Sequence, residues 1–155
     1  MCFNALKKAS VVLMVVFILS MLVTGMTFKS TEKSSDTVYI PDPYLEKTVR
    51  DALDMPEGDI STKAMLTLHE LYAGGRGIKD LTGLEYAGYL GRLFLNDNRL
   101  QDISLLVGLK NLEYVDVRLN DLDTSAGSGT LRQIQQLMNA GTKVEYEPQK
   151  TAPEQ

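Results

Sequence analysis

The feature that most constrains the fold is a set of apolar residues that recur every 22 residues between residues 68 and 122. Four such series run through this stretch: Leu68, Leu90 and Leu112; Leu71, Leu93 and Val115; Ala73, Leu95 and Val117; and Ile78, Leu100 and Leu122. A long helix could also place residues at this interval on one face, because the interval makes about six turns. Seven glycines between residues 74 and 108 would interrupt such a helix. The period therefore indicates a stacked repeat and not a helical bundle.

The repeat reads L-x-x-L-x-L-x-x-N-x-L, which is the pattern of a leucine-rich repeat with its period of about 20–29 residues. Each copy is expected to form one short strand that pairs with the strand of the next copy. The leucines then turn inward and stack as one continuous apolar column. The sequence thus predicts an α/β solenoid with a parallel sheet, built by residues 68–123.

Four polar residues mark the turns of the predicted repeat. Asn98 and Asn120 lie where the chain leaves each strand, and Arg76 holds the equivalent place in the first copy. A side-chain amide can satisfy backbone groups that a turn leaves unpaired. Asp80 and Asp102 also repeat, and Asp102 is expected to cap the turn that follows it. We therefore assign a structural role to these two asparagines and two aspartates.

Both flanks of the repeats carry helix signals, as expected for caps that cover the ends of a stacked core. Asp42 is a good N-cap with Pro43 at the first helical position, and Ser61 can cap a second short helix. Ser128 can cap a later helix, and the alternation around Val144 predicts a last strand. We expect a helical N-terminal cap over residues 39–67, a helix–strand C-terminal cap over 124–149 and a disordered tail over 150–155.

The N-terminal segment has the composition of an export signal. Lys7 and Lys8 precede a largely apolar run over residues 9–26, and the segment contains no acidic residue. The run is also nearly long enough to span a membrane, which takes about 20 apolar residues. We expect residues 1–26 to be a signal peptide or an uncleaved membrane anchor, and residues 27–38 to be a polar spacer. The protein is then secreted or held at the cell surface.

Several motifs together resemble the internalin-like leucine-rich-repeat domains of Gram-positive bacterial surface proteins. They are IPDPYLEKTVRDAL from residue 40, GDIST from residue 58, LTGL from residue 81, DISLL from residue 102 and VEYEPQ from residue 144. The resemblance covers residues 40–149, although Leu105 replaces a proline that is common in that turn. It implies a right-handed curved solenoid with the sheet on its concave face, and extracellular binding of a protein or glycan.

The variable residues that flank the buried leucines are expected to form three rows on the concave face. The rows are Glu70, Arg92 and Tyr114; Tyr72, Phe94 and Asp116; and Gly74, Asn96 and Arg118. Exposed rings such as Tyr72 and Phe94 beside an arginine are typical binding anchors. The same rings could instead only steady the sheet by packing across strands, and the charged residues could be an ordinary solvated face. The predicted ligand-binding residues are Glu70, Tyr72, Arg92, Phe94, Asn96, Tyr114, Asp116 and Arg118.

The size of this face limits its ligand. Three strands of five residues cover about 250 Å² in projection, whereas a standard protein interface needs about 800 Å² on each partner. We therefore expect a small ligand such as a peptide or glycan, or a larger protein that also contacts the caps.

Composition argues against several other classes of function. A formal net charge of −4 does not suit a nucleic-acid-binding protein. Cys2 and His69 are the only cysteine and histidine, so we expect no metal site built from these residues. No catalytic or phosphate-loop motif is present, and we expect neither an enzyme nor a cofactor. Two alternatives stay open: weak calcium binding by paired carboxylates such as Asp97 with Asp121, and a structural envelope protein held by its N-terminal helix.

Overall fold

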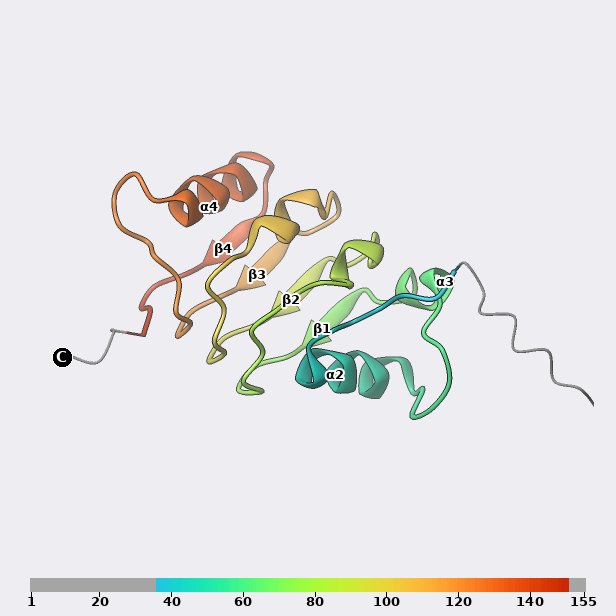
Figure 1. Ribbon diagram of the computed structural model, residues 1–155. Coiled ribbons are helices and arrows are strands. Elements are labelled where there is room, and N and C mark those ends of the chain that lie inside the picture. The colour runs from blue at the N-terminus through green and yellow to red at the C-terminus, as the bar shows by residue number, and fades with distance from the viewer. Residues whose placement is uncertain (1–35, 151–155) are drawn as a thin grey trace, which may run out of the picture. The chain divides into compact units, whose positions relative to one another are not determined.

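The computed structural model describes residues 36–150, so the predicted signal peptide or anchor, most of the spacer and the end of the tail lie outside the described residues. Four strands lie side by side, with α2 and α3 beyond β1 and with α4 next to β4 (Figure 1). The elements in chain order are α2 (Pro43–Leu53), α3 (Thr62–Met65), β1 (Glu70–Tyr72), η1 (Leu84–Tyr86), β2 (Arg92–Phe94), η2 (Ser104–Gly108), β3 (Tyr114–Asp116), α4 (Gly129–Asn139) and β4 (Lys143–Glu145).

The strands form one parallel sheet in sequence order, with the register that the 22-residue spacing predicts. Leu71 pairs with Leu93, and Leu93 pairs with Val115. Val144 continues the same line beside Val115, so the last strand, which we placed in the C-terminal cap, is the fourth strand of the repeat sheet.

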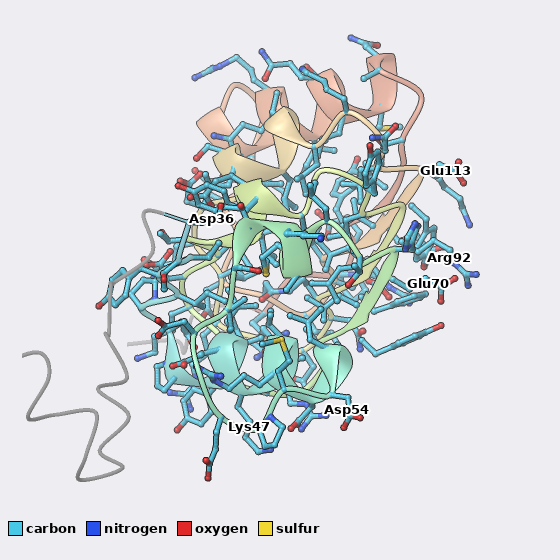
Figure 2. The ribbon with its side chains drawn as sticks, turned by 90° about the vertical axis from the view of Figure 1, so that its right-hand side faces the viewer. Asp36, Lys47, Asp54, Glu70, Arg92 and Glu113 are labelled. Carbon is cyan, nitrogen blue, oxygen red and sulfur yellow. The ribbon has the colours of Figure 1, made fainter. Side chains whose placement is uncertain are left out.

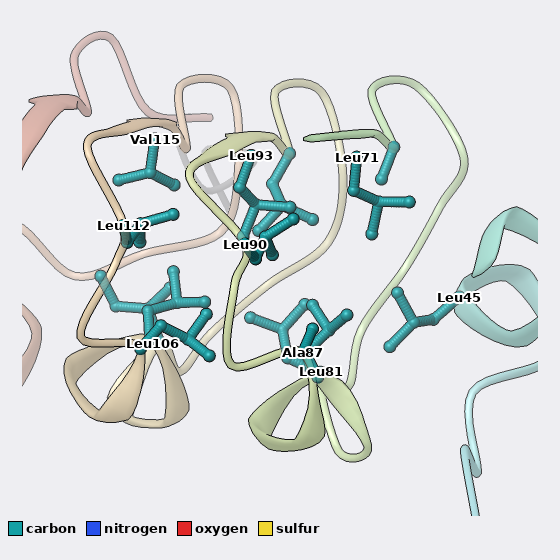
Figure 3. Packing of buried hydrophobic residues seen from close by; sticks show 14 of the residues in the cluster. Leu45, Leu71, Leu81, Ala87, Leu90, Leu93, Leu106, Leu112 and Val115 are labelled. Carbon is teal, nitrogen blue, oxygen red and sulfur yellow. The ribbon is translucent and has the colours of Figure 1, made fainter. Parts of the chain in front are cut away.

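The buried leucines stack behind this sheet. Leu71, Leu93 and Val115 lie in one file, Leu90 and Leu112 lie behind it, and all are at most 5% exposed (Figure 3). Each fully buried leucine contributes about 1.5–3 kcal/mol relative to an exposed one. The spine therefore fixes the strands side by side, and the side chains that alternate with it must face outward.

The N-terminal helix is joined to the first repeat by Asp42. Its Oδ1 accepts hydrogen bonds from the backbone N–H groups of Tyr44 and Leu45 at 2.9 and 3.1 Å, which caps α2. Its Oδ2 accepts from the N–H groups of Lys79 and Asp80 at 2.8 and 3.2 Å. Burial alone raises the pKa of Asp42, but these four donors outweigh burial and the pKa lies below its ordinary value.

The two ends of the described chain are more ordered than the sequence predicts. Val38, placed in the polar spacer, is only 6% exposed, and its N–H donates to the carbonyl of Ile60 at 2.7 Å. Lys150, placed in the disordered tail, donates its N–H to the carbonyl of Asn120 at 2.8 Å. The polar neighbours of these two residues in the sequence conceal their contacts, which are burial in the core for Val38 and hydrogen bonds to the strand-exit turns for Lys150.

One helix face also differs from the prediction. Met138 is 51% exposed, although its spacing places it on the apolar face of the closing helix. The residues of α4 that are buried are Thr130, Ile134 and Leu137. The side of α4 that packs on the core is therefore narrower than the apolar face that the sequence pattern indicates.

Candidate functional site

The turn asparagines hold successive coils at a fixed spacing, where a coil is one copy of the repeat. The Nδ2 of Asn98 donates to the carbonyls of Ala73 and Leu95 at 2.7 and 2.9 Å. Its Oδ1 accepts from the N–H groups of Arg76 and Ile78 at 3.1 and 3.0 Å. One buried amide thus satisfies four backbone groups from two coils. Each of these groups would cost folding free energy if it were buried without a hydrogen-bond partner.

Asn120 makes the same kind of connection one coil later. Its Nδ2 donates to the carbonyls of Leu95 and Val117 at 2.9 and 3.0 Å, and its Oδ1 accepts from the N–H of Leu100 at 3.0 Å. The two asparagines fix the level at which the strands end, and they thereby align the exposed side chains of neighbouring strands.

The repeated aspartates close the turns on the far side of each coil. Asp80 accepts from the N–H and hydroxyl of Thr82 at 2.8 and 2.7 Å. Asp102 accepts from the N–H and hydroxyl of Ser104 at 2.9 and 2.7 Å, and its hydrogen bond from the Ser104 hydroxyl is the main cause that lowers the pKa of Asp102. These carboxylates are engaged within their own turns, which suits a structural role.

The open face of the sheet, defined as the outward side chains of β1 to β4, contains the predicted rows and extends them. Glu70, Arg92 and Tyr114 are in register, as are Tyr72, Phe94 and Asp116. Lys143 continues the first row beside Tyr114, and Glu145 continues the second beside Asp116. Sequence reasoning missed these two residues, although they flank Val144 as the other row members flank their leucines.

Three aromatic rings meet on the open face. The rings of Tyr72 and Phe94 are stacked, with centroids 4.7 Å apart and planes 6° from parallel. The ring of Tyr114 lies 5.2 Å from Phe94 and is tilted by 46°. Tyr72 is 60% exposed, so the ring face turned away from Phe94 is open to a ligand. Stacking fixes these rings before any ligand arrives, which lowers the entropic cost of binding.

Ionic and hydrogen-bonding partners hold the first part of this aromatic row. Arg92 forms an ion pair with Glu70 at 2.9 Å, and its guanidinium lies 5.7 Å from the Phe94 ring centroid. The hydroxyl of Tyr72 donates to Glu70 at 2.7 Å, and this bond is the main cause that raises the pKa of Tyr72. Glu70 and Arg92 project on the same side of the molecule (Figure 2).

A second ionic group lies at the β3–β4 side. The guanidinium of Arg118 pairs with Asp116 at 2.7 Å and with Glu145 at 3.3 Å. Lys143 pairs with Glu145 at 2.9 Å and lies 5.3 Å from the Tyr114 ring centroid. Burial is the first cause that raises the pKa of Tyr114, followed by the nearby carboxylates. Charges of opposite sign on this face are thus paired with one another.

Asp116 differs from the expectation that it contacts a ligand. It is only 3% exposed, and its carboxylate accepts from the backbone N–H and the guanidinium of Arg118. The hydrogen bonds to Asp116 are the main cause that raises the pKa of Arg118. Asp116 is therefore a positioning residue for Arg118, and sequence alternation alone could not reveal that the arginine covers it.

The third predicted row begins at Gly74, which has no side chain. The side chain of Asn96 lies over Gly74, where an added Cβ would come within 2.9 Å of the Asn96 Oδ1. A larger residue at this position would therefore have to displace the Asn96 amide. Asn96 is half-buried, so it presents part of its amide at the edge of the open face.

Two further features of residues 36–150 are the arrangement of potential metal ligands and the length of the helices. In this part of the chain no group of three histidine, cysteine or acidic side chains is arranged to hold a metal ion. Asp97, a candidate for a calcium pair, forms an ion pair with Lys150 at 3.2 Å. None of the helices described for these residues combines the length and the apolar character needed to cross a membrane.

Comparison with known proteins gives structural matches alone. No protein family profile matches the chain, and no curated protein matches it in sequence. The fold is similar to an internalin, InlF, of Listeria monocytogenes (24% identity, TM-score 0.57, covering 69% of this chain and 30% of that chain). It is also similar to the functional domain of InlJ from Listeria monocytogenes (27% identity, TM-score 0.54, covering 72% and 22%).

A structure containing the CBM51-2 and INT domains of Clostridium perfringens ZmpB matches 53% of this chain and 18% of that chain, with 33% identity and a TM-score of 0.45. The chain therefore spans less than a third of the length of each of these three proteins. The two Listeria matches and the four-stranded parallel sheet show that the chain has a leucine-rich-repeat-like fold.

Proposed function

We propose that the chain is an exported recognition module that binds a protein, peptide or glycan through the open face of its sheet. The observation that carries this proposal is the row of contacting rings of Tyr72, Phe94 and Tyr114 on the outward side of the sheet, in which Tyr72 is exposed and the other two are half-buried. Large rings beside an arginine are the side chains that most often dominate binding energy. The likeness to internalin InlJ supports a surface protein-interaction module at a coarse level.

The proposal includes the shape of the domain. We propose that the coils form a short right-handed solenoid with the open face on its concave side, closed by a helical cap at the β1 end and by α4 at the other. A leucine-rich repeat needs such ends because its terminal coils would otherwise expose the apolar spine. Leu45 of α2 points toward the end of the spine beyond Leu71 (Figure 3), as a cap residue should.

The area and the charges of the open face limit the kinds of ligand that it can bind. Four strands of three residues cover about 200 Å² in projection, well below the roughly 800 Å² of a standard interface. The charged groups on this face are paired internally, so a charged ligand would have to compete with existing ion pairs. A short peptide or a glycan with few charges fits this face better than nucleic acid.

The role is proposed to be recognition without catalysis. The charged residues of the open face are committed to ion pairs and ring contacts with one another. The proposal therefore assigns the face no reaction and no cofactor.

The test is a comparison of affinities with matched variants. Partners are captured from the envelope and medium of the producing cell on the immobilised chain, and each is then titrated by calorimetry. Tyr72→Ser with Phe94→Ser should weaken binding at least about a hundredfold, because the loss of one aromatic hot-spot residue costs about 2 kcal/mol of binding free energy. The control is Tyr39→Ser with Tyr44→Ser, which removes two exposed rings outside the sheet. Equal affinities for the parent and the Tyr72/Phe94 variant would refute the site.

Export is tested separately by cell fractionation. A soluble form in the medium that starts near residue 26 would support cleavage and secretion. Full-length protein in the membrane fraction would support an anchored envelope protein, for which the open face could still bind ligand. Protein confined to the cytosol would contradict both.

A further inference from the structure

A hollow of about 540 Å³ lies at the edge where the strands of the sheet begin, apart from the aromatic row. It extends across all four coils, from His69 before β1 to Gly141 before β4. Its volume is in the range of small-ligand sites, which is about 300–1,000 Å³. No part of the proposed recognition role explains it.

The hollow arises at one position of the repeat, the residue just before each of the first three strands. His69, Gly91 and Glu113 are spaced by 22 residues, so they occupy the same place in three successive coils. The middle coil carries no side chain there, and space is left between the side chains of its two neighbours. A Cβ at Gly91 would meet only the carbonyl oxygens of His69 and Asn111, both at 3.7 Å, and this glycine has no positive φ. Backbone geometry therefore does not demand glycine at this position. The clear consequence of a glycine here is the hollow.

An aromatic wall closes one side. The rings of His69 and Tyr89 are stacked, with centroids 6.4 Å apart and planes 9° from parallel. The His69 Nδ1 lies 2.8 Å from the carbonyl of Thr67, so this nitrogen carries the proton and the ring is held in place. Tyr89 is largely exposed. The wall can pack against an apolar or aromatic side chain.

Two exposed side chains of opposite charge in the lining are outside the ion pairs of the part of the chain that the structure describes. Lys110 makes a single long hydrogen bond, at 3.4 Å to the carbonyl of Val107. Among residues 36–150, neither Lys110 nor Glu113 has an ion-pair partner within 4.0 Å, although six other acidic and six other basic side chains in this part of the chain do. Glu113 projects outward beyond Arg92 and Glu70 on the same side of the molecule (Figure 2).

The charged groups of the lining come from three neighbouring coils. Glu70 begins β1, Arg92 begins β2, and Lys110 and Glu113 both precede β3, while Ala140 and Gly141 follow α4, whose C-terminal end is negative. Arg92 uses only one of its N–H groups for Glu70. A ligand with an ammonium group toward Glu113 and α4 and a carboxylate over Gly91 would meet groups of opposite charge at both ends.

We propose that this hollow is a second binding site, for a zwitterionic ligand of amino-acid or dipeptide size. The ammonium group meets Glu113 and the end of α4, the carboxylate lies over Gly91 between Lys110 and Arg92, and the side chain next to the carboxylate packs on Tyr89 and His69. This site is independent of the proposed function of the open face, with which it shares only the Glu70–Arg92 pair.

The experiment titrates the nitrogen-15-labelled full-length chain in a non-ionic detergent with glycyl-L-phenylalanine and follows amide shifts by NMR. The amides of Gly91, Glu113 and Gly141 should move together and saturate. N-acetylglycyl-phenylalanine lacks the ammonium group and glycyl-phenylalanine amide lacks the carboxylate. Each should bind about tenfold more weakly, because one charge-assisted contact is lost.

Variants separate the site from its surroundings. Gly91→Val fills the hollow and should abolish the shifts, whereas Gly108→Val, at a glycine in η2 with open space around it, should leave them unchanged. Lys110→Met and Glu113→Gln each remove one charge and should weaken binding about tenfold, which keeps the test decisive if Gly91→Val does not fold. Tyr72→Ser with Phe94→Ser should bind the dipeptide as the parent does.

Four results would overturn the proposal. The dipeptide could leave the three amides unmoved, the blocked peptides could bind as tightly as the zwitterion, or Gly91→Val and both charge variants could bind like the parent. Loss of dipeptide binding in the Tyr72/Phe94 variant would likewise refute a separate site. None of these results bears on whether the open face recognises a macromolecule.

Discussion

Gln149 takes, in the last coil, the place that Asn120 takes in the coil before it. The Oε1 of Gln149 accepts from the backbone N–H of Asn120 at 3.0 Å, and its Nε2 donates to the carbonyls of Val117 (3.1 Å) and Tyr146. Gln149 follows Val144 by five residues, as Asn120 follows Val115. The ladder of side-chain amides therefore ends on a glutamine, and β4 is a true member of the repeat.

Removing this last amide should loosen the final coil alone. In Gln149→Ala the N–H of Asn120 loses its partner and the carbonyl of Val117 loses one of its two donors, so native-state hydrogen exchange should show faster exchange in β4 and little change in β1 and β2. Gln135→Ala, at an exposed position of α4, is the control. Equal protection of β4 in both variants would mean that Gln149 does not hold the coil.

A larger effect is expected at Asn98, in the middle of the ladder. Asn98→Ala removes the partner of the Ala73 carbonyl and of the Arg76 and Ile78 N–H groups, whereas the Leu95 carbonyl keeps its bond from Asn120; the loss should cost about 2–4 kcal/mol in the free energy of unfolding measured in urea. Asn139→Ala, at an exposed helix position, should stay within about 0.5 kcal/mol of the parent. A loss below about 1 kcal/mol at Asn98 would contradict its role.

Asp42 should make the stability of the domain depend on acid pH. Its pKa is lower in the folded chain than the value of about 3.9 in an unfolded chain, so the folded state binds the proton less readily. The stability from Asp42 is complete well above pH 4 and is lost as the pH falls through the folded pKa. Asp42→Asn should be less stable by about 1–3 kcal/mol at pH 7 and should lose less of its remaining stability on acidification.

The control for this prediction is Asp59→Asn, which removes an exposed carboxylate outside the helices and strands. Its unfolding should follow the same pH dependence as the parent. If Asp42→Asn also lost stability on acidification as steeply as the parent, the two helix-capping and two repeat-anchoring hydrogen bonds would not be the source of the acid sensitivity.

Leu119 should be a site where substitution stabilises the chain. It has a φ of 55° at the strand exit, where the two preceding coils place Gly75 and Asp97, also with positive φ. A leucine in this conformation costs about 1–2 kcal/mol, whereas asparagine adopts it more readily. Leu119 is also 42% exposed, so little burial is lost. Leu119→Asn should raise the midpoint of urea unfolding by the equivalent of about 0.5–1 kcal/mol, and a lowered midpoint would show that its apolar contacts outweigh the strain.

The sequence predicted the parts of the fold that depend on a constant step. The file of Leu71, Leu93 and Val115 and the rows beside it follow from 22-residue spacing, because parallel strands in register place equal positions side by side. The step from Val115 to Val144 is 29 residues, since α4 is inserted before β4. A search at a fixed period could therefore not assign Lys143 to the same face.

The parts of the site that escaped prediction depend on contacts between side chains. Alternation placed Asp116 outward, but only the structure shows that the guanidinium of Arg118 covers it. The hollow at Gly91 could not be predicted from the sequence for a similar reason. A missing side chain matters there only because His69 and Glu113 stand on either side of it.

The most direct test of the whole account is a measurement of methyl–methyl contacts by NMR in the full-length chain. Strands in register place neighbouring side chains about 4.8 Å apart and second neighbours about 10 Å apart. We predict strong cross-peaks between Leu71 and Leu93, between Leu93 and Val115 and between Val115 and Val144, and none between Leu71 and Val115. Missing neighbour contacts, or a contact between Leu71 and Val115, would contradict the stacked spine and with it the face on which recognition is proposed to occur.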